Sequence, residues 1–258
     1  MSRLDDLLTL NSWLLADMPM YAAQAATFPR DEVHQWRLFR SLVNVRQPGD
    51  ASPAFLALQD HFLQEEIAAK GITDWHDLSP QEDGIYLWQG DITTLRVDAI
   101  VNAANSGMTG CYHPCHGCID NAIHTYAGIQ LRSACHAIMQ AQGLPEPPGQ
   151  AKLTPAFNLP CRYIIHTVGP IVQGELRERH RELLAACYRS CLQAAEARKL
   201  ESLALCCIST GEFSFPHEEA AAIALREVRA YRSNGGACQV IFNVFSSLDR
   251  EIYERLLS

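Results

Sequence analysis

The chain has 258 residues, of which 48% are hydrophobic and 19% charged, and its net charge at pH 7 is −8. This composition is typical of a globular protein with a buried core. An acidic chain without a marked Lys/Arg run is not expected to bind nucleic acid as its main partner. It contains no run of about eighteen apolar residues, and its acidic N-terminus does not resemble a signal peptide, so we expect no membrane partner and a cytoplasmic location.

The ten cysteines raise the question of disulfide bonds. In a chain of this length without a secretion signal, we expect a reducing compartment, in which the thiols are free or bound to metal.

Residues 1–80 are predicted to form a helical N-terminal extension. The best-defined helix covers 53–70, because Ser52 suits the N-cap, Pro53 the first helical position and Gly71 the residue after the end. A second helix is predicted over 31–43. We expect this extension to pack on the rest of the chain, while docking of a partner or gating of a substrate remains open.

From residue 81 to 258 the pattern changes to short apolar runs that alternate with helical ones. Nearly continuous apolar strands predict a sheet covered on both faces, and hence an α/β domain with three layers, α/β/α. The proline-rich segment 143–160 is expected to be a long connection. The expected strands are 84–92, 97–103, 162–169, 202–209 and 238–245, and the expected helices are 119–139, 178–198 and 216–232.

A loop that follows the strand at 97–103 is dense in thiols and imidazoles. Within eight residues it holds Cys111, His113, Cys115, His116 and Cys118. Thiolate and imidazole groups are ligands of zinc, and a catalytic zinc uses three protein ligands with one position open. The loop therefore predicts a metal site, and a turn with incidental thiols is the alternative.

Several short motifs lie in one order along residues 84–256. They are Gly90-Asp91-Ile92-Thr93, VDAIVNAAN at 97–105, AKLTPAFNLP at 151–160, YIIHTVGP at 163–170, ISTGEFSFP at 208–216 and VIFNVF at 240–245. Together they resemble a macrodomain, the ADP-ribose-binding module. The resemblance implies a mixed central sheet between helical layers.

The interval between the NAAN turn and Asp120 reads SGMTGCYHPCHGCI, where most catalytic macrodomains carry glycines. This interval is similar to that of the zinc-dependent branch of macrodomains, which also has an N-terminal extension. The branch pattern implies that Zn²⁺ is held by Cys111, His116 and Cys118. A spacing of four intervening residues and then one allows these three to surround one ion, while Cys115 or, less readily, His113 remains an alternative ligand.

The resemblance also implies roles in binding ADP-ribose. Asp91 would bind the adenine amino group with help from the Ile92 backbone, and Phe245 would stack on the adenine. The loop that binds the diphosphate through backbone N–H groups would be formed by Ser209, Thr210, Gly211, Glu212 and Phe213.

The distal ribose is expected beside Phe213, with its hydroxyls bound by Asn105. Asp120 and Asn121 open the next helix, where Asp120 corresponds to an aspartate of catalytic macrodomains and Asn121 is a candidate substrate contact. A carboxylate in this first turn also suits the helix dipole. Asn105, Asp120 and Phe213 are the candidate catalytic residues.

The expected activity is hydrolysis of mono-ADP-ribose from a modified protein, with an ester to Asp or Glu as the expected bond. The alternatives are an ADP-ribose-binding module with structural zinc and an O-acetyl-ADP-ribose deacetylase. Zinc-dependent macrodomains commonly accompany a sirtuin-type ADP-ribosyltransferase and a lipoyl carrier, so the resemblance implies a modified lipoyl carrier as the partner protein.

Overall fold

The computed structural model describes residues 2–258 and centres on a seven-stranded mixed sheet. The strand order is β2-β3-β9-β8-β5-β7-β6, and the strands from β3 to β7 in this order are parallel. The edge strands β2 and β6 pair antiparallel with their neighbours. The bounds are β2 (Pro80–Glu82), β3 (Ile85–Gln89), β5 (Ala99–Ala104), β6 (Ala151–Pro155), β7 (Tyr163–Val168), β8 (Ser202–Leu205) and β9 (Gln239–Val244).

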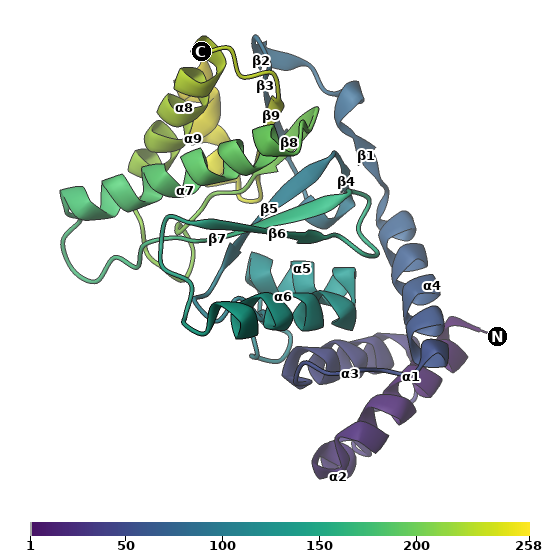
Figure 1. The fold of residues 1–258 in the computed structure, drawn as a ribbon. Coiled ribbons are helices and arrows are strands. Elements are labelled where there is room, and N and C mark those ends of the chain that lie inside the picture. Colours follow the sequence, from purple (N-terminus) through teal and green to yellow (C-terminus); the bar gives the residue numbers. More distant parts are fainter. Residues whose placement is uncertain (1) are drawn as a thin grey trace.

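Helices cover both faces of the sheet (Figure 1). One face is covered by α7 (Glu178–Ala197), α8 (His217–Ser233) and α9 (Ser247–Leu257), and the other by α5 (Ile119–Ala127) and α6 (Ile129–Gln142). The buried strands β5, β8 and β9 are predominantly apolar, as is typical of a sheet covered on both sides. The predicted three-layer α/β/α fold with a mixed sheet is therefore confirmed.

The N-terminal extension is helical and lies beyond α5 and α6 (Figure 1). It comprises α1 (Arg3–Asp17), η1 (Pro19–Tyr21), α2 (Ala22–Ala25), α3 (Glu32–Val45) and α4 (Pro53–Lys70). Ser52 caps α4 by accepting a hydrogen bond from the Phe55 N–H, and Gly71 follows it with a φ of 86°. Both α3 and α4 pack on α5. The extension therefore packs against the helical layer that carries the candidate site.

The connection from α4 to the sheet contains short elements. These are β1 (Thr73–Asp74), η2 (Trp75–Asp77), η3 (Ile92–Thr94) and β4 (Leu95–Arg96), and β1 pairs parallel with β4. Since α4 ends at Lys70 and one hydrophobic cluster joins the extension to the sheet domain, the boundary at residue 80 stays a prediction.

Two expected elements differ in the structure. The helix predicted over 119–139 is two helices, because Gly128 breaks the helix with a φ of 94° and a ψ of 168°, a conformation that only glycine adopts readily. The connection at 143–160 contains strand β6, which pairs with β7 at the edge of the sheet and ends at Pro155, where a proline is tolerated.

Within the described residues, no helix has both the length and the apolar character needed to cross a membrane. The ten cysteines all lie within the described residues, and none of them forms a disulfide bond.

Gly128→Ala is expected to lower the free energy of unfolding by about 1–3 kcal/mol, because a Cβ there is strained and would crowd polar side chains. It would lie 2.7 Å from Gln59 Nε2 and 3.0 Å from Asn158 Nδ2. Gly49→Ala is the matched control, since a Cβ there meets nothing within 4 Å, and its effect should stay within about 0.5 kcal/mol. Urea unfolding of both variants measures this, and equal effects would contradict the explanation.

Candidate functional site

The predicted site residues gather at the carboxyl ends of adjacent parallel strands. Asp91 follows β3, Asn105 follows β5, the 209–213 loop follows β8, and Phe245 follows β9. Because these strands are neighbours in the sheet, their carboxyl ends form one edge. Ligands of open α/β sheets bind at such an edge.

Three side chains of the 111–118 loop converge. The ligand atoms of Cys111, His116 and Cys118 all lie within 4.8 Å of one another, and Cys111 Sγ is 3.7 Å from His116 Nδ1. Two thiols and an imidazole are a zinc donor set, and bonds of about 2.0–2.3 Å require this kind of convergence. The residues therefore fit a zinc ion held through Sγ, Nδ1 and Sγ.

Cys118 is also the N-cap of α5, where its Sγ accepts from the Asn121 N–H at 3.4 Å. Burial, together with the charges of Cys111 and Asp120, raises the pKa of Cys118 to about 12. Without a cation beside it, this thiol is protonated at neutral pH.

The two other candidate ligands point elsewhere. Cys115 Sγ lies 3.3 Å from Ser41 Oγ and 3.5 Å from the Arg37 carbonyl, both on α3. His113 is exposed and does not belong to the convergent group. The cysteines and histidines of the loop thus have different surroundings. Three of them converge as candidate ligands, and the thiol of Cys115 contacts the N-terminal extension.

The second ring nitrogen of His116 connects two loops. His116 Nε2 lies 3.5 Å from Glu212 Oε1, while Nδ1 faces Cys111. A metal-bound histidine commonly directs its second nitrogen toward a carboxylate or carbonyl, which fixes the ring. This contact brings the predicted diphosphate loop next to the cysteine-rich loop.

Asp120 is buried in the first turn of α5, with only 4% of its surface exposed. Its Oδ1 accepts from Asn102 Nδ2 at 2.8 Å, and its Oδ2 accepts from Asn105 Nδ2 at 3.1 Å. Burial raises the pKa of Asp120 to about 6, against the opposing effects of these amides and of the Arg132 charge. Asn105 Nδ2 also donates to the Gly110 carbonyl, directly before Cys111.

Buried polar side chains on the sheet form a hydrogen-bonded chain that ends at Asp120. Asn102 and His166 are paired residues of β5 and β7, and Asn102 Nδ2 lies 3.1 Å from His166 Nδ1. His166 Nε2 lies 2.9 Å from Thr154 Oγ1 on β6. Because Asn102 Nδ2 donates to Asp120, its amide orientation is fixed, and His166 Nδ1 must be the acceptor.

His166 also belongs to a second convergent group, with His124 and Cys135. Both ring nitrogens of His166 are already engaged with Asn102 and Thr154, so we interpret this group as part of the buried polar chain. His124 Nε2 lies 3.5 Å from Asp120 Oδ1, but burial, with His166 and Arg132 nearby, holds the pKa of His124 well below its usual value. His124 is therefore neutral and forms no ion pair with Asp120.

The 209–213 loop presents backbone amides. Ser209 has a φ of 67°, and its carbonyl accepts from the Phe215 N–H, which closes the loop. Among the described residues, the N–H groups of Gly211, Glu212 and Phe213 bond to no other residue. Consecutive unpaired amides before a helix suit an anion.

The packing around this loop is close. Thr210 Oγ1 donates a hydrogen bond to the Cys207 carbonyl, and Phe213 packs against Met108 and Val168. Gly169 allows the end of β7 to approach the loop, because a Cβ there would lie 2.0 Å from Ser209 Oγ.

The N-terminal extension contacts the residues that are predicted to bind the adenine. Asp91 Oδ1 accepts from the Thr93 N–H, and Asp91 Oδ2 forms a 2.6 Å ion pair with Lys70 at the end of α4. Burial opposes ionisation of Asp91, but the Lys70 and Thr93 hydrogen bonds outweigh it and lower the pKa. The Ile92 N–H bonds to no other residue in the described chain, and Phe245 is 80% exposed. The exposed Phe245 ring is therefore available to a ligand.

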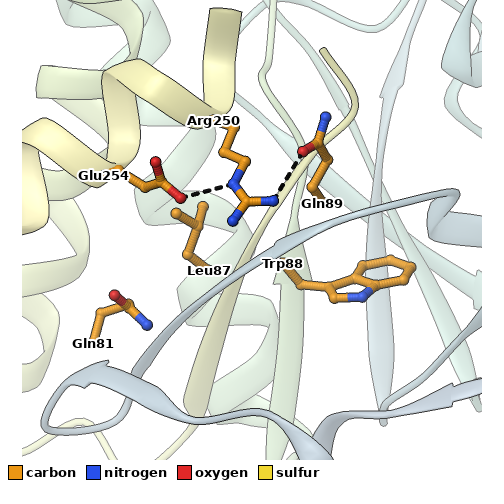
Figure 2. A pocket seen from close by; sticks show the side chains of 6 residues that line it. All are labelled: Gln81, Leu87, Trp88, Gln89, Arg250 and Glu254. Atoms are coloured by element: carbon orange, nitrogen blue, oxygen red, sulfur yellow. Dashed lines mark hydrogen bonds and ion pairs between the residues drawn. The ribbon is translucent and has the colours of Figure 1, made fainter. Parts of the chain in front are cut away.

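A separate cavity of about 250 Å³ lies between β3 and α9. Figure 2 shows Arg250 bridging Glu254 and Gln89 there, while the Trp88 side chain points away from them. The cavity contains none of the predicted site residues, and it is lined by Gln81, Leu87, Trp88, Gln89, Arg250 and Glu254.

Comparison with known proteins identifies the family. A profile of the Macro domain matches residues 101–224. A Treponema medium protein named protein-ADP-ribose hydrolase is 53% identical over 254 residues, which cover 96% of this chain and 97% of that protein. The chain belongs to the macrodomain family.

Two further similar proteins support the assignment of this chain to the macrodomain family. A Staphylococcus aureus (strain MRSA252) protein, also named protein-ADP-ribose hydrolase, is 48% identical over 85% of this chain and 83% of its own length. The Trypanosoma brucei macrodomain in complex with ADP-ribose aligns with a TM-score of 0.66 and 30% identity, over 85% of this chain and 95% of that one.

Several residues that support the candidate site through polar contacts are not singled out by the sequence. Asn102 and His166 interrupt apolar strands, and a polar residue inside such a run was a usable signal of a buried network. Arg40, Asn44 and Lys70 lie on helices of the extension, where nothing in the local pattern indicates contact with the site.

Asn121 was predicted to contact substrate. In this macrodomain its side chain is fully buried, and its amide contacts Arg40 and the His113 carbonyl. A direct contact with ligand stays a prediction.

His166 is expected to remain neutral between pH 5 and 8 as the Nε2–H tautomer. Burial lowers its pKa to about 3, so the charged form exists only well below this range. Long-range ¹H–¹⁵N NMR across this pH range should show unchanged ring shifts, with the signal assigned through its loss in His166→Gln. A titration midpoint between pH 5 and 8 would contradict the proposed hydrogen-bond chain.

Proposed function

We propose that this macrodomain hydrolyses the bond between ADP-ribose and a modified protein, with a zinc ion held by Cys111, His116 and Cys118. The observation that carries the proposal is the convergence of these three donors beside Asn105, Asp120 and the unpaired amides of the 211–213 loop. The protein-ADP-ribose hydrolase names of relatives at 48–53% identity support the same reaction.

The ligand would lie along the carboxyl edge of the sheet. Phe245 would stack on the adenine, with Asp91 and the Ile92 N–H at the base edge. The diphosphate would bind the amides of Gly211 to Phe213, with Ser209 and Thr210 shaping the loop. Binding through amides explains how an acidic protein accepts an anion, because the unpaired N–H groups supply the positive potential.

The distal ribose would then lie near Phe213 and Asn105. Asn105 Oδ1 accepts from the Gly107 N–H and retains a lone pair for a ribose hydroxyl. Asp120 fixes the orientation of this amide through its own hydrogen bond to Asn105. The two residues would thus hold the ribose with its anomeric carbon toward the 111–118 loop.

The loop fits zinc by its donor set and by the convergence of its ligand atoms. When bound, zinc in an open site polarises a substrate oxygen or lowers the pKa of a coordinated water toward about 7. Glu212 would hold the His116 ring through its Nε2 atom. Since Cys115 contacts α3, the arrangement favours three protein ligands and an open position.

The finer substrate assignment depends on the resemblance described above. It favours an ester of ADP-ribose with Asp or Glu on a lipoyl carrier in the cytoplasm, modified by a sirtuin-type transferase. Relative rates on ester-linked and otherwise linked ADP-ribosyl proteins test the bond. Faster turnover of free O-acetyl-ADP-ribose than of any modified protein would favour the deacetylase alternative.

The zinc content of cysteine variants distinguishes the predicted zinc ligands from the neighbouring thiol of Cys115. We expect one zinc per chain and loss of zinc in Cys118→Ala. The matched control Cys115→Ala should retain zinc, because its thiol faces α3 and the backbone N–H that joins residue 115 to Asn44 stays in place. Metal analysis after dialysis measures this. Chelation should abolish release of ADP-ribose from a modified protein, and added Zn²⁺ should restore it.

Undiminished turnover by the metal-free protein would refute zinc dependence. Retained zinc in Cys118→Ala would refute the ligand assignment. Tight ADP-ribose binding without turnover of any linkage would favour a binding module with structural zinc.

Phe245→Ala should weaken ADP-ribose binding about 5- to 150-fold, because base–aromatic stacking contributes about 1–3 kcal/mol. Phe245→Trp should retain affinity. Leu248→Ala is the control, since Leu248 is also an exposed apolar residue near the end of β9. Calorimetric titration measures all three, and an unchanged Kd for Phe245→Ala would place the adenine elsewhere.

A further inference from the structure

We propose that Arg40, on helix α3 of the N-terminal extension, is a positioning residue that holds the 111–118 loop in the shape required by its three metal ligands. This inference rests on the zinc site of the proposed function. It assigns the extension a role in the site, in addition to its packing against α5.

The loop has little secondary structure of its own. Within the described residues, the segment 109–117 makes one backbone–backbone hydrogen bond, from the His116 N–H to the His113 carbonyl. Gly117 is exposed, and a Cβ there would meet nothing within 4 Å. The relative placement of Cys111, His116 and Cys118 must therefore come from contacts outside the loop backbone.

Arg40 supplies such contacts at the centre of the loop. Its Nη2 donates to the His116 carbonyl at 2.8 Å and to Asn121 Oδ1 at 2.9 Å, and its Nε lies 3.3 Å from the same Oδ1. The guanidinium thus joins the backbone of one predicted ligand to the first turn of α5. Its rigid fork of donors suits two acceptors at once, whereas a lysine ammonium has no such fixed geometry.

Asn121 extends this connection to both sides of the loop. Its Nδ2 donates to the His113 carbonyl at 3.0 Å, and its backbone N–H donates to Cys118 Sγ at 3.4 Å. The side chain is fully buried, so an Oδ1 without a partner would carry the cost of an unsatisfied buried acceptor. Arg40 removes that cost and fixes Asn121 in the rotamer that holds His113.

Cys115 provides a second attachment to α3. It has a φ of 53°, its N–H donates to Asn44 Oδ1 at 2.9 Å, and its Sγ contacts Ser41 Oγ. Asn44 lies four residues after Arg40 and three after Ser41 on the same helix, so it is a surface neighbour of both on the side that meets the loop. The helix and the loop are therefore joined at two adjacent points, residues 115 and 116.

Groups that orient metal ligands from outside the coordination sphere commonly contribute about 10- to 100-fold in metal affinity. Removing Arg40 should leave the three ligands chemically intact while allowing the loop more conformations. Metal binding would then have to order the loop, and the affinity should fall.

The test compares the full-length protein with Arg40→Ala, Arg40→Lys and Arg37→Ala. Arg37 is the matched control, because it lies one turn away on α3, is exposed, and its guanidinium bonds to no other described residue. Zn²⁺ affinity is measured by competition with a chromogenic chelator. Co²⁺ substitution reports the ligand geometry, and thermal unfolding of the metal-free proteins reports the fold.

We expect a 10- to 100-fold higher Kd for Zn²⁺ in Arg40→Ala, an intermediate value in Arg40→Lys, and a wild-type value in Arg37→Ala. The Co²⁺ spectrum of Arg40→Ala should change in its ligand-field bands. The metal-free variant should stay folded, with an unfolding temperature lowered by several degrees because the buried Asn121 Oδ1 loses its donor. If Arg40→Ala instead unfolds, the Arg40→Lys affinity, measured on folded protein, decides the question.

Wild-type Zn²⁺ affinity and an unchanged Co²⁺ spectrum in the Arg40 variants would overturn this inference and leave the zinc site standing. A wild-type protein that binds no metal would overturn both the zinc site and the positioning role. If Arg37→Ala loses as much Zn²⁺ affinity as Arg40→Ala, the positioning role is also overturned. The loss would then result from removing a positive charge from α3 and not from removing the Arg40 contacts.

Discussion

The shape of the cysteine-rich loop depends on one buried amide, that of Asn121. Its nitrogen binds the His113 carbonyl and its oxygen accepts from Arg40, while its backbone N–H is directed at Cys118 Sγ. Within the described residues the loop backbone makes one hydrogen bond of its own, so Asn121 and Arg40 supply the contacts that join residues 113, 116 and 118. Together with the Asn105 hydrogen bond to the Gly110 carbonyl, these contacts account for the placement of the three ligand atoms, which lie within 4.8 Å of one another.

Hydrogen bonds from side chains of the central sheet hold the site residues in place. Asn102 and His166 are neighbours on β5 and β7, and the hydrogen bonds from Thr154 to Asp120 run through them. Asp120 in turn holds Asn105, whose amide reaches the carbonyl directly before Cys111. The proposed ribose contacts and the proposed metal ligands are therefore tied to the same strands, which gives a physical reason why both lie at the same edge of the sheet.

The fold and the convergence of Cys111, His116 and Cys118 could be predicted from sequence because their signals are local. Apolar strands mark the covered sheet, and few residue types bind zinc, so five cysteines and histidines in eight residues are informative. The break at Gly128 depends on neighbours such as Gln59, which the local sequence does not show. Arg40 and Asn121 are 81 residues apart in the chain, and their contact is not visible in either helix pattern.

The most direct test of the account is an anomalous-scattering map of the crystallised protein, recorded on both sides of the zinc absorption edge. The account predicts one peak bonded to Cys111 Sγ, His116 Nδ1 and Cys118 Sγ, with no fourth protein ligand and with the open position facing Asn105. A peak closed by Cys115, or a peak at His124, Cys135 and His166 with none at the loop, would contradict the central claim.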